Sequence, residues 1–167
     1  QELLQEAQLH ALRGRVGTVR CQEVMSRDLV VTAPQALAME AWHLLSHHQI
    51  KALPVVDEGD KLVGIITLHD LMIDRVGRQP RARAELEQLT VADLMTREVH
   101  KARRYQPLYD LVEAFSDGGL HHMPVVEGDR LVGIITQSDM VAALFTLALK
   151  PGLTEDEVPP VSHKNEP

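Results

Sequence analysis

Two pairs of side chains in this sequence join a hydroxyl to a carboxylate at the same spacing. Thr67 lies three residues before Asp70, and Thr136 lies three residues before Asp139. Each threonine ends a copy of the same hexapeptide, Leu-Val-Gly-Ile-Ile-Thr. A threonine that ends a strand and an acidic residue three positions later can cap a helix, because each side chain satisfies a free backbone N–H group. This structural interpretation requires no ligand.

The same side chains also suit the recognition of a nucleoside phosphate. A helix N-terminus attracts anions, a threonine hydroxyl can donate to a phosphate, and a carboxylate can accept hydrogen bonds from both hydroxyls of a ribose. Gly64 and Gly133 precede the threonines by three residues, where the missing side chain lets a flat base or another backbone approach closely. On spacing alone, capping and ligand binding both remain open.

The repeated motif is part of a longer internal duplication. Residues 24–29 match 94–99 at an offset of 70, and residues 53–57 match 123–127 at the same offset. One residue is deleted from the second turn, so the offset becomes 69 at the two aspartates. The alignment predicts a lead-in helix or linker over 1–21, a first repeat over 22–76, a linker over 77–90, a second repeat over 91–149 and a disordered tail over 150–167.

Each repeat shows the same order of hydrophobic patterns. In the first repeat these predict a strand over 29–32, a helix after Pro34, a hairpin of strands over 51–56 and 61–67, and a helix over 68–76. The second repeat follows the same order and ends with a helix over 137–149. One such sheet is too small to bury its apolar surface alone. We therefore predict an α+β fold of two β-α-β-β-α repeats, packed through their sheets about a pseudo-two-fold axis.

Composition and charge narrow the class of protein. Seventeen Lys and Arg stand against 24 Asp and Glu, and the net charge of −7 disfavours nucleic acid as a partner. Cys21 is the single cysteine, so the chain has no internal disulfide, and no run of about 18 apolar residues is present. We expect a cytoplasmic protein. Because the sequence begins with Gln1 and not with methionine, we also expect it to be part of a longer chain.

The residue patterns favour neither a catalytic site nor a metal site. No nucleophile has a neighbouring base, and no glycine-rich loop of the Walker type is present, so we predict that the chain is not an enzyme. His43, His47 and His48 lie close together, but no Glu or Cys completes a ligand set with them. We therefore predict no metal site.

Taken together, the duplicated motifs resemble a family, the tandem cystathionine-β-synthase (CBS) domain pair, also called a Bateman module. The resemblance covers about three quarters of the chain and is carried by Leu53-Pro54-Val55-Val56 with Gly64-Ile65-Ile66-Thr67-x-x-Asp70, by Met123-Pro124-Val125-Val126 with Gly133-Ile134-Ile135-Thr136-x-x-Asp139, and by Val24-Met25-Ser26 and Leu94-Met95-Thr96. It implies clefts between the repeats that bind adenosine-containing ligands and regulate an attached protein. The expected ligand is AMP, ADP or ATP, with NAD or S-adenosylmethionine also compatible.

The resemblance also implies which side chains form two unequal clefts. In the family, the threonine and aspartate hold phosphate and ribose, residues just before the Pro-Val-Val strand contact the phosphates, and the opening of the opposite repeat borders the base. Carried over by position, the first cleft comprises Thr136, Asp139, His121, His122, Ser26 and Arg27. The second cleft comprises Thr67, Asp70, Lys51, Thr96 and Arg97.

A second resemblance concerns the protein to which this module is attached. The segment 118–126 with Thr136-Gln137-Ser138-Asp139, and Arg13 to Val16 before Cys21, are similar to the C-terminal portion of bacterial HPP-family membrane proteins. The expected partners are therefore a small-molecule nucleotide, a second copy in a homodimer, and a covalently attached effector domain that can be transmembrane. The alternative is a dimerisation or interaction module whose clefts no longer bind a ligand.

Overall fold

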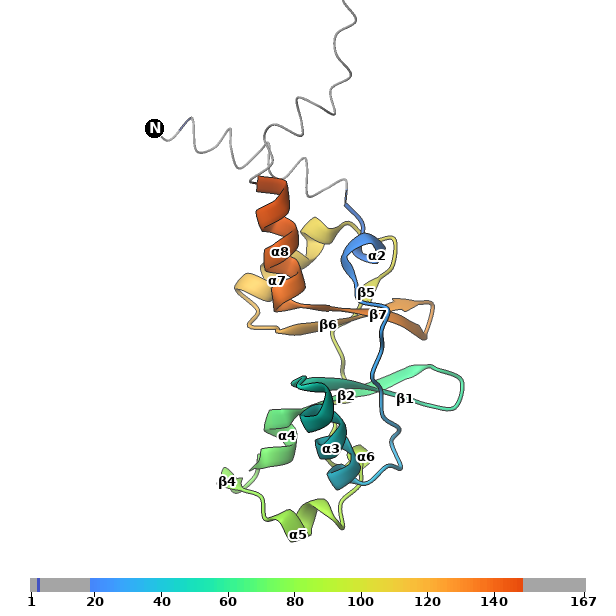
Figure 1. Ribbon diagram of the computed structural model, residues 1–167, viewed down its shortest axis with the longest axis vertical. Helices are drawn as coiled ribbons and strands as arrows, with labels where there is room; N and C mark the ends of the chain where they lie inside the picture. Colours follow the sequence, from blue (N-terminus) through green and yellow to red (C-terminus); the bar gives the residue numbers. More distant parts are fainter. Residues whose placement is uncertain (1–2, 4–18, 149–167) are drawn as a thin grey trace, which may run out of the picture.

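The computed structural model describes residue 3 and residues 19–148 (Figure 1). The predicted tail over 150–167 lies outside these residues, as does all of the predicted lead-in segment over 1–21 except residues 3 and 19–21. Within the described residues, no helix has the length and apolar character needed to cross a membrane.

The first half of the described chain contains the β1–β2 hairpin, a smaller two-stranded hairpin and several helices. Its elements are α2 (Cys21–Val24), α3 (Ala38–His48), β1 (Ala52–Val56), β2 (Leu62–Thr67), α4 (Leu68–Met72), β3 (Ile73–Asp74), β4 (Gln79–Pro80) and α5 (Arg83–Leu86). The second half contains α6 (Val91–Leu94), β5 (Ala102–Arg103), the 3-10 helix η1 (Leu108–Leu111), α7 (Val112–Ser116), β6 (His122–Glu127), β7 (Arg130–Thr136) and α8 (Gln137–Ala148).

The two hairpins are near copies of each other. Strands β1 and β2 pair antiparallel with a register shift at Val55/Val56, and β6 and β7 pair antiparallel with the same shift at Val125/Val126. Strand β1 is buried along its whole length, whereas β2 and β7 alternate between buried and partly buried residues. Alternation is the pattern of a strand that covers a core with one face only. Both predicted hairpins are confirmed.

Two predicted elements of the first repeat differ from the structure. The expected strand over 29–32 is reduced to one parallel bridge between Thr32 and Val55, whereas the second repeat forms a true parallel pair of β5 with β6. The helix expected over 68–76 ends at Met72. After it, Ile73 and Asp74 adopt extended backbone and pair with β4, so the helix is replaced by a small hairpin.

Each apolar core combines the body of one repeat with the opening segment of the other. Cys21 and Met25 pack into the core that contains β6, β7, α7 and α8. Val91 and Met95 pack into the core that contains α3, β1, β2 and α4. The exchange ties the two repeats together, because neither core is complete without residues from both.

The motif glycines make this exchange possible. A Cβ atom on Gly64 would lie 2.7 Å from Sδ of Met95 and 2.9 Å from the carbonyl oxygen of Thr96. A Cβ atom on Gly133 would lie 2.3 Å from Sδ of Met25. The missing side chains therefore admit the opening segment of the opposite repeat, which was one of the two uses expected for these glycines.

The two hairpins face each other, and the helices lie on the outer sides (Figure 1). A third apolar cluster joins them at their turn ends, with Val56 and Leu62 from one hairpin and Val126 and Leu131 from the other. At the same end, the N–H of Leu62 donates to the carbonyl oxygen of Asp129 at 3.0 Å. The predicted α+β fold of two repeats packed through their sheets is confirmed.

Candidate functional site

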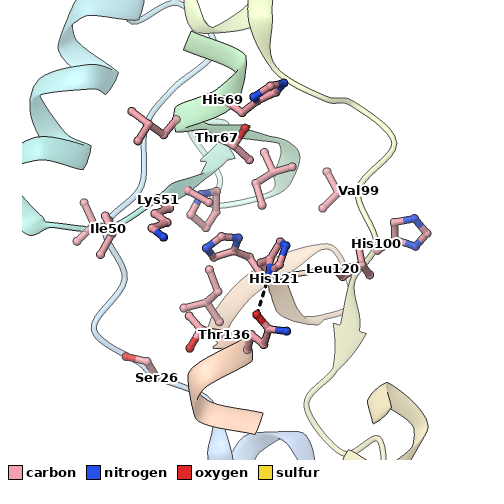
Figure 2. A pocket seen from close by; sticks show the side chains of 18 of the residues that line it. Ser26, Ile50, Lys51, Thr67, His69, Val99, His100, Leu120, His121 and Thr136 are labelled. Atoms are coloured by element: carbon pink, nitrogen blue, oxygen red, sulfur yellow. Dashed lines mark hydrogen bonds between the residues drawn. The ribbon is translucent and has the colours of Figure 1, made fainter. Parts of the chain in front are cut away.

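A cavity lies between the hairpins at the end opposite the apolar cluster, where β2 and β7 run into α4 and α8. Its volume is about 1190 Å³. Figure 2 shows residues of both repeats around it, among them Lys51 and Thr67 from the first and His121 and Thr136 from the second. We expected two clefts, but one continuous cavity reaches both threonines. The turn ends of the two hairpins are held together by the apolar cluster.

Both threonine–aspartate pairs form capping boxes. The N–H of Asp70 donates to Oγ1 of Thr67 at 3.1 Å, and the N–H of Thr67 donates to Oδ2 of Asp70 at 2.9 Å. In the second repeat the N–H of Asp139 donates to Oγ1 of Thr136 at 3.2 Å, and the N–H of Thr136 donates to Oδ2 of Asp139 at 2.9 Å. The capping interpretation is therefore confirmed for both pairs. Capping uses Oδ2 of each aspartate and does not involve Oδ1.

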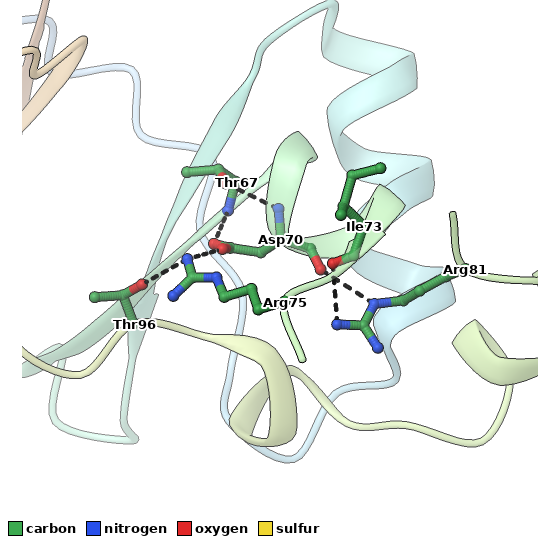
Figure 3. A network of polar contacts seen from close by, with 6 residues as sticks. All are labelled: Thr67, Asp70, Ile73, Arg75, Arg81 and Thr96. Atoms are coloured by element: carbon green, nitrogen blue, oxygen red, sulfur yellow. Dashed lines mark hydrogen bonds and ion pairs between the residues drawn. The ribbon is translucent and has the colours of Figure 1, made fainter. Parts of the chain in front are cut away.

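The second carboxylate oxygens lie in different surroundings. Oδ1 of Asp70 forms an ion pair with Nη2 of Arg75, and that nitrogen also donates to Oγ1 of Thr96 at 3.3 Å (Figure 3). The side chain of Asp70 is only 1% exposed, and it does not line the cavity. Asp139 is partly exposed and does line the cavity. Among the described residues, no side chain pairs with its Oδ1, which leaves this oxygen able to accept hydrogen bonds from a ligand.

Basic and imidazole side chains collect in the middle of the cavity. Lys51 and His121 occupy equivalent positions just before β1 and β6, and their carbonyl oxygens accept hydrogen bonds from the first N–H groups of α4 and α8. Nδ1 of His121 donates to Oε1 of Gln137 at 2.9 Å. The pKa of His122 is lowered, chiefly by burial and further by the nearby His121 and Lys51. Such a cluster of donors suits an anionic group.

Eight of the residues assigned by resemblance to the two clefts line this one cavity: Ser26, Lys51, Thr67, Thr96, His121, His122, Thr136 and Asp139. Asp70, Arg27 and Arg97 do not. Arg27 and Arg97 follow residues that bridge to β7 and β2, and in extended backbone neighbouring side chains point to opposite sides. Nη2 of Arg97 donates instead to the carbonyl oxygen of Ala92 at 3.3 Å.

Several polar lining residues were not found from the sequence. His69, His100, Asp28, Glu98 and Gln137 line the cavity as well. His69 lies inside the Thr67–Asp70 motif and Gln137 inside its counterpart, so their positions in the motif were the available signal. Within the described residues, no group of three His, Cys, Asp or Glu side chains is arranged to hold a metal ion.

Comparisons with known proteins bear on the fold and on the kind of ligand. The family model of the CBS domain matches residues 21–75 and 91–146. An inosine-5'-monophosphate dehydrogenase from Methanocaldococcus jannaschii is 30% identical over 137 residues, which are 81% of this chain and 25% of that enzyme. This chain also covers 62% of a protein from Methanopyrus kandleri with 28% identity. It thus spans less than two thirds of the length of these curated relatives.

Solved structures of two CBS pairs contain adenosine ligands. The CBS domain pair of protein MJ0100, in complex with 5'-methylthioadenosine and S-adenosyl-L-methionine, is 32% identical with a TM-score of 0.62, and the match covers 77% of this chain and 96% of that one. CBSX2, a CBS-pair protein of Arabidopsis thaliana, in complex with AMP is 26% identical with a TM-score of 0.65, and the match covers 77% of this chain and 97% of that one. With both repeats matched in sequence and in fold, the chain belongs to the CBS-domain family and carries two copies of the domain as a pair.

Proposed function

We propose that this chain is a regulatory module that binds an adenine nucleotide in the cavity between its two repeats. The observation that carries the proposal is the cavity itself, which is lined by Asp139 with a carboxylate oxygen that no side chain of the described residues pairs with, by the hydroxyl of Thr136, and by a cluster of lysine and histidine side chains. The adenosine ligands of the related CBS pairs support the same class of ligand.

The ribose and the phosphates of the nucleotide each have a matching group in the cavity. Oδ1 of Asp139 is available to accept hydrogen bonds from the ribose hydroxyls. Oγ1 of Thr136 accepts the capping hydrogen bond from Asp139, so its own hydrogen remains able to donate to a phosphate oxygen. His121, His122 and Lys51 surround the space beside this hydroxyl and complement the phosphate charge. AMP, ADP and ATP all meet these requirements.

Binding at the seam between the repeats gives the module a way to transmit its state. Lys51 comes from the first repeat and Thr136 from the second, so a nucleotide that contacts both stabilises one relative arrangement of the two. The ligand shifts an attached domain only by its differential affinity for two arrangements, commonly about 1–3 kcal/mol. We propose an effector domain attached to this module on the cytoplasmic side, with an HPP-type membrane protein as one candidate.

A second candidate function is assembly without a ligand. Val141 and Phe145 are 59% and 63% exposed on α8, which is unusual for two large apolar side chains one helical turn apart. A homodimer formed through this face would cover them. In the regulatory interpretation, the chain forms this homodimer and also binds a nucleotide. In the assembly interpretation, formation of the homodimer is the only function.

Thermal unfolding in the presence of candidate ligands tests the proposal. The series comprises AMP, ADP, ATP with and without magnesium, NAD and S-adenosylmethionine. A ligand at about 100 times its dissociation constant adds about 2.7 kcal/mol, which is about 5–10 °C in Tm for a chain of this size. We expect at least one adenine nucleotide to give this shift.

Asp139→Asn and Asp129→Asn provide the matched variants. The first removes the charge that receives the ribose, and we expect an affinity loss of at least about 30-fold, because hydrogen bonds to charged groups contribute about 1.5–3 kcal/mol each. The second removes an exposed carboxylate of the β6–β7 turn and leaves the shift unchanged. If no ligand moves the Tm of the wild-type protein while sedimentation shows a stable dimer, the assembly function replaces the regulatory one.

A further inference from the structure

In the half of the cavity lined by Lys51, Thr67 and Thr96, here called the Thr67 half, Arg75 pairs with Asp70, the carboxylate that the family resemblance assigns to a ribose (Figure 3). Its Nη2 pairs with Oδ1 of Asp70, while Oδ2 of Asp70 accepts from the N–H of Thr67 at 2.9 Å. The same Nη2 donates to Oγ1 of Thr96 at 3.3 Å. Both oxygens of the carboxylate and the hydroxyl of Thr96 are therefore engaged by groups of the chain itself.

The segment after α4 holds Arg75 in this place. The helix ends at Met72, whose carbonyl oxygen accepts a hydrogen bond from the backbone N–H of Arg81 at 2.8 Å. The guanidinium of Arg81 donates to the carbonyl oxygens of Asp70 at 3.3 Å and Ile73 at 3.2 Å. These bonds satisfy the end of the short helix and turn the chain, so that Arg75 follows the strand β3 and not a further helical turn.

As far as the structure describes it, to residue 148, the second repeat has no counterpart to this arrangement. At the repeat offset of 69, Arg75 corresponds to Leu144, which lies in α8 and packs against the apolar core of that half. Because α8 continues to Ala148, the chain does not turn back toward Asp139 within the described residues. The two halves of the cavity therefore differ in whether an arginine pairs with the carboxylate that could bind a ribose.

We infer that Arg75 sets the number of nucleosides that the cavity accepts, closing the Thr67 half to a ribose and leaving one nucleoside per chain at Asp139. This inference rests on the proposed function. A ligand with two riboses, such as a dinucleotide, cannot bind its second ribose through Asp70. A nucleotide with one ribose and a phosphate chain remains compatible, because the Thr67 hydroxyl and Lys51 still line the cavity as phosphate donors.

Calorimetric titration with AMP, and separately with ATP, measures this number. We expect one AMP per wild-type chain and two per chain of Arg75→Ala, in which Oδ1 of Asp70 is released. Arg75→Met keeps the apolar stem of the side chain but has no donor for Asp70, so it provides a second variant if the alanine variant is unstable. Arg83→Ala is the matched control: it removes an exposed arginine of the same segment, whose partner is Glu87 at 3.7 Å, and the number stays at one.

The outcomes separate this inference from the proposed function. One nucleotide on both the wild-type protein and the Arg75 variants, or two on the wild-type protein, overturns the role of Arg75 and leaves the binding function standing. One nucleotide on Arg75→Ala and none on the wild-type protein supports the closing of the Thr67 half by Arg75, but it overturns the site at Asp139 and the number of one nucleoside per wild-type chain. No binding to any of these proteins overturns both.

A measurement without ligand tests the same contact. We compare the Tm losses, relative to the wild-type protein, of Asp70→Asn, Arg75→Gln and the variant that carries both changes. We expect the double variant to unfold close to Asp70→Asn, since either single change breaks the ion pair. If the two Tm losses simply add, the side chains are not coupled and the inference fails whatever the nucleotide titrations show.

Discussion

The Thr67 and Thr136 halves of the cavity are built from the same hexapeptide, but they differ in whether the motif aspartate is available to a ligand. Both threonines cap a helix, both strands pair in the same register, and both glycines admit the opening segment of the other repeat. The halves separate only after the helix begins, where α4 stops at Met72 and α8 continues to Ala148. A motif thus fixes the local geometry of its aspartate, while a residue outside the motif decides whether that aspartate is available.

A third threonine–aspartate pair shows how little the spacing alone specifies. Thr90 and Asp93 form a capping box at the start of α6, with the N–H of Thr90 donating to Oδ2 of Asp93 at 2.8 Å. This hydrogen bond and a second one from the Thr90 hydroxyl lower the pKa of Asp93. Neither residue lines the cavity. The threonine and aspartate therefore gain a possible ligand role only where a strand end, a helix start and the opposite repeat meet.

The largest effects on stability are expected at the two motif glycines. Gly64→Ala places a methyl group against the backbone carbonyl of Thr96, which has little freedom to move, whereas Gly133→Ala meets only the side chain of Met25. Overpacking of this kind costs about 1–3 kcal/mol. We expect Gly64→Ala near the upper end of this range and Gly133→Ala lower, measured by urea unfolding. Equal losses would show that both opening segments move equally easily.

The two motif aspartates should rank in opposite order for stability and for affinity. Asp70→Asn removes the charge that faces Arg75, and we expect a loss of about 2 kcal/mol, discounted because the Arg75 side chain is 60% exposed. Asp139→Asn weakens only a capping hydrogen bond and costs less than about 1 kcal/mol. Nucleotide affinity falls strongly for Asp139→Asn and less than about threefold for Asp70→Asn. Urea unfolding measures the loss of stability of each variant, and nucleotide titration measures its loss of affinity. The prediction is contradicted if the same variant shows the larger loss in both measurements.

Local patterns were sufficient to predict the hairpins, α8 and the capping boxes. Each depends on residues within a few positions of one another, namely strand alternation, turn residues and a threonine followed by an acidic residue. The duplication then indicated that two such units pack together. The family resemblance supplied the candidate residues of the cavity, eight of which the fold brings to one space.

The features that the sequence did not reveal depend on contacts between distant residues. The apolar residues Leu71, Met72 and Ile73 continue a helical pattern, and the end of α4 depends on hydrogen bonds from Arg81, about two helical turns further along. Arg75 and Arg81 follow α4 in the sequence, and both bind groups of that helix. The apolar face of α3 ends at Leu45, and His48 is exposed.

Lys51 offers a test of whether the closed half still contributes to binding. Lys51→Met keeps the length and apolar stem of the side chain but removes its charge from the cavity. We expect the affinity for ATP to fall about tenfold, or about 1.4 kcal/mol, and that for AMP to fall less, because a longer phosphate chain extends toward the Thr67 half. Lys61→Met, which changes an exposed lysine outside the cavity, is the control. Equal losses for both nucleotides would place the phosphates in the Thr136 half alone.

The smallest expected effect is a pH dependence caused by His122, whose position in the first repeat is taken by Ala52. The pKa of His122 lies below 6.5 because of burial and the neighbouring His121 and Lys51. In the ligand-free protein, its contribution to stability is complete above pH 6.5 and is lost as the pH falls through the lowered pKa.

A bound phosphate reverses this preference, because it stabilises the imidazolium form of His122. The affinity of the wild-type protein for AMP, divided by that of His122→Gln, should therefore rise about threefold between pH 7.5 and 5.5, since the bound state takes up a proton. Taking the ratio removes the titration of AMP itself, and His69, His100 and His121, which line the same cavity, are present in both proteins. A ratio that is flat across this range would mean that the phosphate binds away from His122, and the nucleotide would then have to enter the cavity in the opposite direction.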